Sequence, residues 1–191
     1  PVALRHSIDL GHSNSERRLH VSVSLPFGNP GAAGAFADSV SNPASPNYRQ
    51  FISPDEVGRR FGLSDAQLGS VVQYLRGHGF QIDLVAKNRL SVLAQGTVAQ
   101  AEAAFQTSIH EFHSPLSREQ GNNDYYSFTS PLQLPSEIAP YIVHVGGLES
   151  YTKPKHCILN PTQARSLYST APMYSSGFQG QGRTVGISNW D

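Results

Sequence analysis

The segment NPASPNYRQFISPDEVGRRFG, residues 42–62, constrains the fold more than any other part of the chain, because it encodes a loop followed at once by a helix. An Asn-Pro and a Ser-Pro pair near its start disfavour helical backbone at the residue before each proline. Ser53 has the features of a helix N-cap, since proline occupies the first helical position and Glu56 is placed to complete a capping box. Gly62 is expected to end this short helix.

The composition argues against several classes of function. The 191 residues include 14 lysines and arginines and 14 aspartates and glutamates, so no net charge favours nucleic acid or a membrane surface. The single cysteine, Cys157, excludes an internal disulfide and a cysteine-rich metal site. No apolar run approaches the roughly 20 residues of a membrane helix, and residues 1–13 lack the apolar core of a signal peptide. We therefore expect neither nucleic acid nor a membrane as a partner.

The region between residues 19 and 112 combines strand and helix patterns. Apolar residues at every second position predict three strands, and apolar stripes or alanine-rich runs predict three helices besides the one at 53–62. The strands cover 19–25, 80–84 and 90–94, and the helices cover 32–40, 64–77 and 97–105. Lys87-Asn88 is the turn candidate between the second and third strands, and a last strand is expected from Thr107 to Phe112.

The order of these elements predicts an α+β fold of the ferredoxin-like type, a βαββαβ antiparallel sheet with helices on one face. Tyr126 and Phe128, and then residues 141–145, are expected to add further strands. Gly146-Gly147 is expected to end this unit. The sequence from 149 to 159 shows little periodicity and predicts a linker.

A second unit is predicted after the linker. Asn160-Pro161 is expected to start a helix, and a strand is expected at 183–188. Gly180-Gln181-Gly182 precedes that strand, whereas a dinucleotide-binding loop follows its strand, so it is interpreted as a turn.

Several segments occur here in the order in which they occur in one peptidase prodomain. They are LHVSVSLP (19–26), SPNYRQFISPDEVGRRFG (45–62), the helix and hairpin of 64–96, TVAQAEAAFQTSIHEF (97–112) and YIVHVGGLE (141–149). From about residue 19 onward the chain resembles the prodomain of sedolisin-type, kumamolisin-like serine-carboxyl peptidases. LNPTQARSLYS (159–169) and GQGRTVGISNWD (180–191) resemble the opening of the subtilisin-like α/β peptidase domain.

The resemblance implies a domain order and a function. It implies an N-terminal extension at 1–18, a prodomain at 19–148, a linker with the processing site at 149–159, and the start of the peptidase domain at 160–191. Such a prodomain assists folding of a secreted, acid-acting endopeptidase and inhibits it until proteolysis at low pH removes the prodomain. The implied partner is the catalytic domain of the same precursor, docked on the sheet. A free-standing inhibitor or binding module of the same fold is the alternative, and an unrelated ferredoxin-like enzyme or RNA module ranks behind both.

The resemblance assigns no catalytic residue, cofactor or metal to this chain, because the family's catalytic groups and its calcium site lie further downstream. No G-x-S-x-G motif occurs in the sequence. The candidate functional residues are therefore of two kinds, a linker that spans the substrate cleft and a signature region that packs or contacts the partner. The linker candidates are Tyr151, Thr152, Lys153, Pro154, Lys155, His156, Cys157, Ile158 and Leu159. The signature candidates are Tyr48, Phe51, Arg59, Arg60 and Phe61.

Some of these residues allow two interpretations. Tyr48 and Phe51 are expected to pin their loop to the core, with partner contact as the alternative. Arg59 and Arg60 are expected on a solvated helix face, where either can also pair with a carboxylate of a partner. The sequence HEFH at 110–113 suggests metal ligands, but the odd spacing places its two histidines on opposite faces of a strand.

The aromatic pair Tyr125-Tyr126, with Phe128 two residues on, also allows two interpretations. It resembles a platform on which nucleotide bases stack, but the neutral chain and the lack of interleaved arginines favour sheet packing.

Overall fold

The computed structural model describes residues 6–115, 123–151, 172 and 175–177. The chain divides into two units, Pro1–Tyr151 and Thr152–Asp191, and every strand and helix named below belongs to the first. The predicted helix at 160 and strand at 183–188 lie outside the described residues. In the described part of the chain, no helix combines the length and apolarity needed to cross a bilayer.

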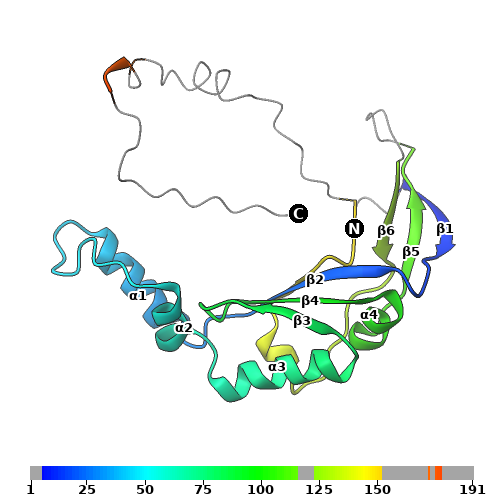
Figure 1. Ribbon diagram of the computed structural model, residues 1–191, viewed down its shortest axis with the longest axis horizontal. Coiled ribbons are helices and arrows are strands. Elements are labelled where there is room, and N and C mark those ends of the chain that lie inside the picture. The colour runs from blue at the N-terminus through cyan, green and yellow to red at the C-terminus, as the bar shows by residue number, and fades with distance from the viewer. Residues whose placement is uncertain (1–5, 116–122, 152–171, 173–174, 178–191) are drawn as a thin grey trace. The chain divides into compact units, whose positions relative to one another are not determined.

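A four-stranded antiparallel sheet forms the centre of the first unit (Figure 1). Its strands lie in the order β3-β4-β2-β7, with bounds Gln81–Val85 for β3, Ser91–Thr97 for β4, Arg18–Ser24 for β2 and His144–Gly146 for β7. Val23 of β2 is paired with Val92 of β4 on one side and Val145 of β7 on the other, and all three are buried. The alternation of apolar residues predicts this inward face correctly for β2 and β4.

Helices α3 (Asp65–Gly77) and α4 (Val98–Phe105) cover one face of this sheet (Figure 1). Both begin with a capping box, Ser64 with Gln67 and Thr97 with Gln100. Their buried side chains complete the hydrophobic core against the inward residues of β2 and β4. These side chains are Val71, Leu75, Val98, Ala101, Ala104 and Phe105.

Helices α1 (Pro30–Ser41) and α2 (Pro54–Phe61) lie at the other end of the four-stranded sheet from strands β1, β5 and β6 (Figure 1). Ser53 caps α2 as predicted, but the Glu56 carboxylate binds Arg59 instead of returning to the cap. Gly58 lets α2 approach the turn between β3 and β4, since a Cβ atom there would lie 2.3 Å from the Lys87 carbonyl oxygen. Arg89 in that turn donates to the Leu63 carbonyl at 3.0 Å.

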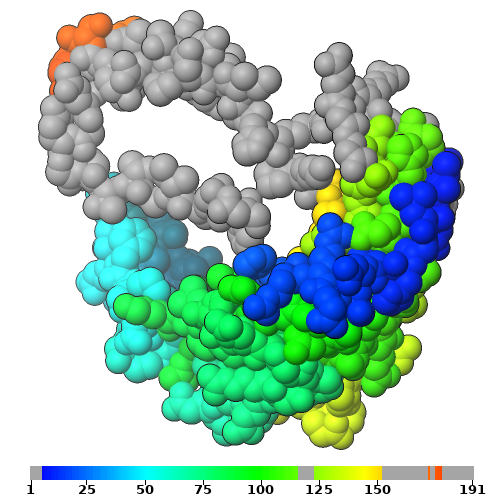
Figure 2. All heavy atoms as spheres, turned by 45° about the vertical axis from the view of Figure 1, so that its right-hand side comes forward, coloured from blue at the N-terminus to red at the C-terminus, as the bar shows by residue number. Residues whose placement is uncertain are grey.

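A separate three-stranded sheet has the order β1-β5-β6, with bounds Ile8–His12, Ile109–His113 and Asp124–Phe128. In Figure 2 the dark blue residues of β1 lie against the green residues of β5, the strand with which β1 pairs. The expectation that the strand at 107–112 closes the first sheet is therefore wrong. Alternating polarity identifies a strand but not its neighbours, and here β7 occupies the edge of β2 while β1 and β6 pair with both edges of β5.

Two further features differ from expectation. Residues 8–12, assigned to an N-terminal extension, form β1. The strand predicted at 141–145 forms only in part, as the short β7 after a 3₁₀ turn at Ala139–Tyr141.

Candidate functional site

The outer face of the four-stranded sheet lies opposite α3 and α4. The side chains that point to it are the alternate residues of β2 and β4 together with Gln81 and Leu84 of β3, which pair with Gln95 and Leu93, and His144 of β7. We call this surface the docking face and define it by Arg18, His20, Ser22, Ser24, Gln81, Leu84, Ser91, Leu93, Gln95 and His144. Most of these side chains are small or polar. The two leucines are the exception.

Leu84 and Leu93 are opposite each other across the β3–β4 pair and are 52 % and 39 % exposed. The alternation of Phe80, Ile82 and Leu84 in the sequence predicts that Leu84 faces the core, and this prediction is wrong. A bulge between Ile82 and Leu84 shifts the register by one residue, which turns Leu84 outward. Two adjacent leucines on an otherwise polar face provide apolar surface that a partner can bury.

The chain leaves the first unit through a segment that is bonded to β6. We call residues 147–151 the exit segment. Leu148 is fully buried, and the Ser150 N–H donates to the Tyr126 carbonyl at 2.9 Å. The Tyr126 hydroxyl donates to the Gly147 carbonyl at 3.2 Å, and the Tyr151 ring lies 4.9 Å from the ring of Tyr125. Of the predicted linker residues, Tyr151 is therefore placed, and Thr152 to Leu159 lie outside the described residues.

The signature candidates separate into buried and exposed residues. Phe61 is buried, and Arg60 lies over its ring and that of Phe36. Arg59 forms ion pairs with Asp55 and Glu56 of its own helix, and no residue of a partner is needed to explain its position.

The aromatic residues of the signature loop lie at the surface. Phe51 is 76 % exposed, so the expectation that it pins its loop to the core is wrong. Local hydrogen bonds hold the loop instead, such as that from Gln50 Nε2 to the Pro46 carbonyl at 2.8 Å. Tyr48 is also exposed, with the Arg49 guanidinium 5.2 Å from its ring centre.

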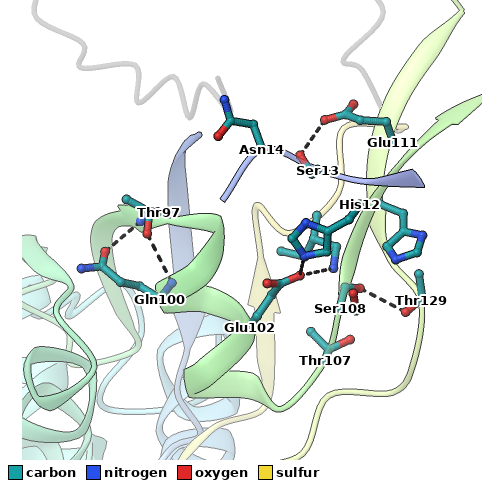
Figure 3. Close-up of polar contacts among 12 residues, drawn as sticks. His12, Ser13, Asn14, Thr97, Gln100, Glu102, Thr107, Ser108, Glu111 and Thr129 are labelled. Atoms are coloured by element: carbon teal, nitrogen blue, oxygen red, sulfur yellow. Dashed lines mark hydrogen bonds and ion pairs between the residues drawn. The ribbon is translucent and has the colours of Figure 1, made fainter. Parts of the chain in front are cut away.

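Three histidine–carboxylate pairs lie on or beside the three-stranded sheet. His12 contacts Glu102 at 2.8 Å, as Figure 3 shows, and Glu102 also accepts from the Ile109 N–H at 2.7 Å. The two histidines of HEFH contact different carboxylates, His110 that of Asp9 and His113 that of Asp124. Within residues 6–115 and 123–151, no group of three or more histidine, cysteine or acidic side chains could hold a metal ion.

The ionisation of Asp9 is expected to make the stability of the fold around β1 depend on pH. The hydrogen bond from the Gly11 N–H and, after it, the contact with His110 lower the pKa of Asp9 below its ordinary value of 3.8. A carboxylate whose pKa falls on folding stabilises the fold above its unfolded pKa, and this stability is lost as the pH drops through the folded pKa.

Asp9→Asn is therefore expected to lower the melting temperature slightly at pH 5 to 7, and the difference from the unsubstituted chain should shrink as the pH falls below 3.8. The effect is small because the carboxylate is exposed. Thermal unfolding followed at a series of pH values measures it. A difference that is the same at pH 7 and at pH 3 would contradict the assignment.

Comparison with known proteins identifies the first unit. Residues 5–151 match the family described as Pro-kumamolisin, activation domain. The chain is 31 % identical over 136 residues to xanthomonalisin from Xanthomonas sp. (strain T-22), a match that covers 71 % of this chain and 16 % of that protein.

Two further relatives give a similar result. Sedolisin from Pseudomonas sp. (strain 101) is 30 % identical over 135 residues, which is 70 % of this chain and 22 % of sedolisin. Tripeptidyl-peptidase 1 from Canis lupus familiaris is 28 % identical over 152 residues, which is 75 % of this chain and 25 % of that protein. The chain thus spans no more than a quarter of the length of these three relatives.

Proposed function

This chain belongs to the pro-kumamolisin activation domain family, and on that premise we propose that it is the prodomain of a secreted sedolisin-type peptidase precursor, which keeps the peptidase domain inactive until proteolysis removes it. The family match over residues 5–151 carries the proposal. The docking face, which no helix of the described residues covers, supports it.

We infer that the peptidase domain of the same precursor covers the docking face. The apolar pair Leu84 and Leu93 supplies the centre of the contact, because removing leucine surface from water stabilises an interface. The serines of β2 and β4 allow close approach around that pair. In this interpretation the unit is ferredoxin-like, with β7 in place of β5 as the fourth strand, and it also assists folding of the domain that it covers.

The linker at 152–159 is proposed to lie across the substrate cleft. A protease cleft binds its substrate as an extended strand, and linker sequence with little periodicity can adopt that form. Residues 160–191 are proposed to begin the subtilisin-like peptidase domain. The calcium that the family binds is proposed for the part of that domain downstream of this chain, and no cofactor is proposed for the chain itself.

Acid is proposed to release the prodomain. His20 and His144 lie on the docking face together with Arg18. Histidine side chains gain positive charge as the pH falls, and carboxylates of a partner lose their negative charge. Loss of the carboxylate charge weakens an interface in which basic groups of the prodomain face acidic groups of the peptidase, and a histidine that becomes charged while buried in that interface adds a desolvation cost.

The test is inhibition of the mature peptidase domain of the precursor by the 191-residue chain, added in trans near neutral pH and in acid. Tight inhibition near neutral pH that weakens in acid is expected. No inhibition at either pH would contradict an inhibitory prodomain. Inhibition of peptidases by a chain whose gene encodes no peptidase domain would identify it as a free-standing inhibitor instead.

A further inference from the structure

The signature loop, residues 42–53 between α1 and α2, exposes an aromatic side chain to solvent. Phe51 is 76 % exposed, more than any other large hydrophobic side chain of the described residues. Tyr48, three residues earlier, is 37 % exposed. Exposed aromatic surface of this kind is typical of sites at which one protein binds another.

Hydrogen bonds within the chain give this loop a defined shape. The Arg49 N–H donates to the Val40 carbonyl of α1 at 2.9 Å, and the Tyr48 N–H donates to the Ser45 carbonyl at 3.0 Å. Arg49 has φ 60, a backbone conformation that residues other than glycine adopt rarely and that clusters at binding and catalytic sites. Because the backbone that carries Phe51 is already ordered, little conformational entropy is lost when a partner binds there.

Close contacts also fix the two helices beside the loop to the rest of the unit. A Cβ atom at Gly28, just before α1, would lie 2.5 Å from the Gly62 carbonyl oxygen at the end of α2. The rings of Phe36 in α1 and Phe61 in α2 lie 5.5 Å apart. Gly58 holds α2 against the β3–β4 turn. The loop and its two helices therefore form a projection with a fixed direction relative to the four-stranded sheet.

This projection extends to the side of the sheet on which the docking face lies. In Figure 1, α3 lies below the strands, whereas α1 runs upward to the loop at the left of the view. The docking face is the surface of the sheet that faces away from α3 and α4. A single partner can therefore contact the docking face and the signature loop at the same time.

The residues of the loop indicate the chemistry and the source of this partner. Arg49 is the only charged residue between 42 and 53, and its guanidinium lies 5.2 Å from the ring centre of Tyr48. A phenylalanine beside an arginine fits an apolar pocket that has a carboxylate at its rim. The matched region is no more than a quarter of each of the three relatives, so most of each relative lies outside this domain.

We propose that the signature loop is a second contact with the peptidase domain, in which Phe51 fills an apolar pocket and Arg49 faces a carboxylate at the rim of that pocket. The inference rests on the proposed prodomain function and adds a surface that the docking face does not include. Two contacts, one on the sheet and one on the projection, fix the orientation of the prodomain on the peptidase.

Inhibition of the mature peptidase domain by the 191-residue chain near neutral pH tests the proposal. Phe51→Ala is expected to raise the inhibition constant roughly 10- to 100-fold. Its melting temperature should stay within about 2 °C of that of the unsubstituted chain, because the side chain is exposed. Ile8→Ala is the matched control, since Ile8 is 57 % exposed but lies on β1, and it should change the inhibition constant by about twofold or less.

The outcomes separate this proposal from the proposed function. If the unsubstituted chain inhibits and folded Phe51→Ala inhibits equally well, the loop contact is wrong and the prodomain function stands. If the unsubstituted chain does not inhibit, the prodomain function is contradicted, and the loop contact is contradicted with it. Self-association of the chain that Phe51→Ala abolishes in sedimentation velocity would assign the loop to a contact between two copies and would likewise overturn the proposal.

The salt dependence of inhibition tests the charged part of the contact. Arg49→Gln removes the charge and keeps a side chain with the same restriction at positive φ. Added salt should weaken inhibition by the unsubstituted chain more steeply than inhibition by this variant. The same dependence in both chains would show that no carboxylate faces Arg49.

Protection from alkylation measures burial of the loop directly. Cys157 is the only cysteine, so Phe51→Cys combined with Cys157→Ser leaves one reactive thiol in the chain. With a saturating peptidase domain whose catalytic serine is replaced by alanine, so that the chain is not cleaved, alkylation at residue 51 should slow roughly tenfold or more. Ile8→Cys in the same background should react at an unchanged rate. Equal rates at residue 51 with and without the peptidase domain would be incompatible with the proposed contact.

Discussion

Gly147→Ala is expected to destabilise the first unit by about 3 kcal/mol or more, because it combines an unfavourable backbone conformation with a steric clash. Gly147 has φ +88, and a Cβ atom there would lie 1.9 Å from the carbonyl oxygen of His20. That carbonyl belongs to β2, where the neighbouring Val21 is buried in the core, so the strand has little freedom to move away. Thermal or denaturant unfolding of the 191-residue chain measures the loss.

Gly11→Ala separates the two contributions. Gly11 also has a positive φ, +103, but nothing lies within 4 Å of the Cβ position. This control variant should therefore lower the free energy of unfolding only by the cost of the positive φ for alanine, about 1–2 kcal/mol. If Gly147→Ala and Gly11→Ala cost the same, the contact with His20 does not constrain the chain, and the tight junction between β7 and the exit segment is not needed for the fold.

Elements whose determinants are local are predictable from the sequence. The N-cap at Ser53 requires only a serine directly before a proline at the first helical position, and it is confirmed. The strand around Val21 and Val23 is confirmed because one buried face requires apolar residues at every second position. In each case, the signal and the structure it specifies lie within a few residues of each other.

Pairing between distant segments is not predictable in this way. β7, which is three residues long, pairs with the edge of β2, and the better-defined strand predicted at 107–112 does not. The bulge beside Leu84 leaves no mark in the alternation of the sequence, yet it creates the apolar centre of the docking face. β1 is not evident because Gly11 and a register shift interrupt its pattern.

The candidate functional site likewise contains parts that local sequence predicts and parts that depend on distant residues. The sequence predicts a linker from its lack of periodicity, but the attachment of the exit segment to Tyr126 depends on residues more than 20 positions apart, which no local pattern connects. Phe51 and Phe61 illustrate the limit, since both are aromatic residues of one signature and only the second is buried. Whether an aromatic side chain of this loop faces the core is decided by how α1 and α2 pack, which the sequence does not specify.

The double substitution Leu84→Glu with Leu93→Glu is expected to weaken inhibition of the peptidase domain by roughly 100-fold or more. The interface would have to bury two carboxylates, directly opposite each other, where it otherwise buries apolar surface. Both leucines are exposed in the isolated unit, so folding itself should change little. The measurement is the inhibition constant of the 191-residue chain near neutral pH, with the melting temperature determined alongside.

Leu10→Glu is the control for this prediction, because Leu10 is 56 % exposed, similar to Leu84, but lies on β1 outside the docking face. It adds one negative charge, against two in the double variant, to a strand of the same unit and should leave the inhibition constant within about twofold of the unsubstituted chain. Equal weakening by Leu10→Glu would point to a general charge effect. Full inhibition by the folded double variant would mean that the peptidase domain binds another surface, for which the exposed aromatic loop at Tyr48 and Phe51 is the next candidate.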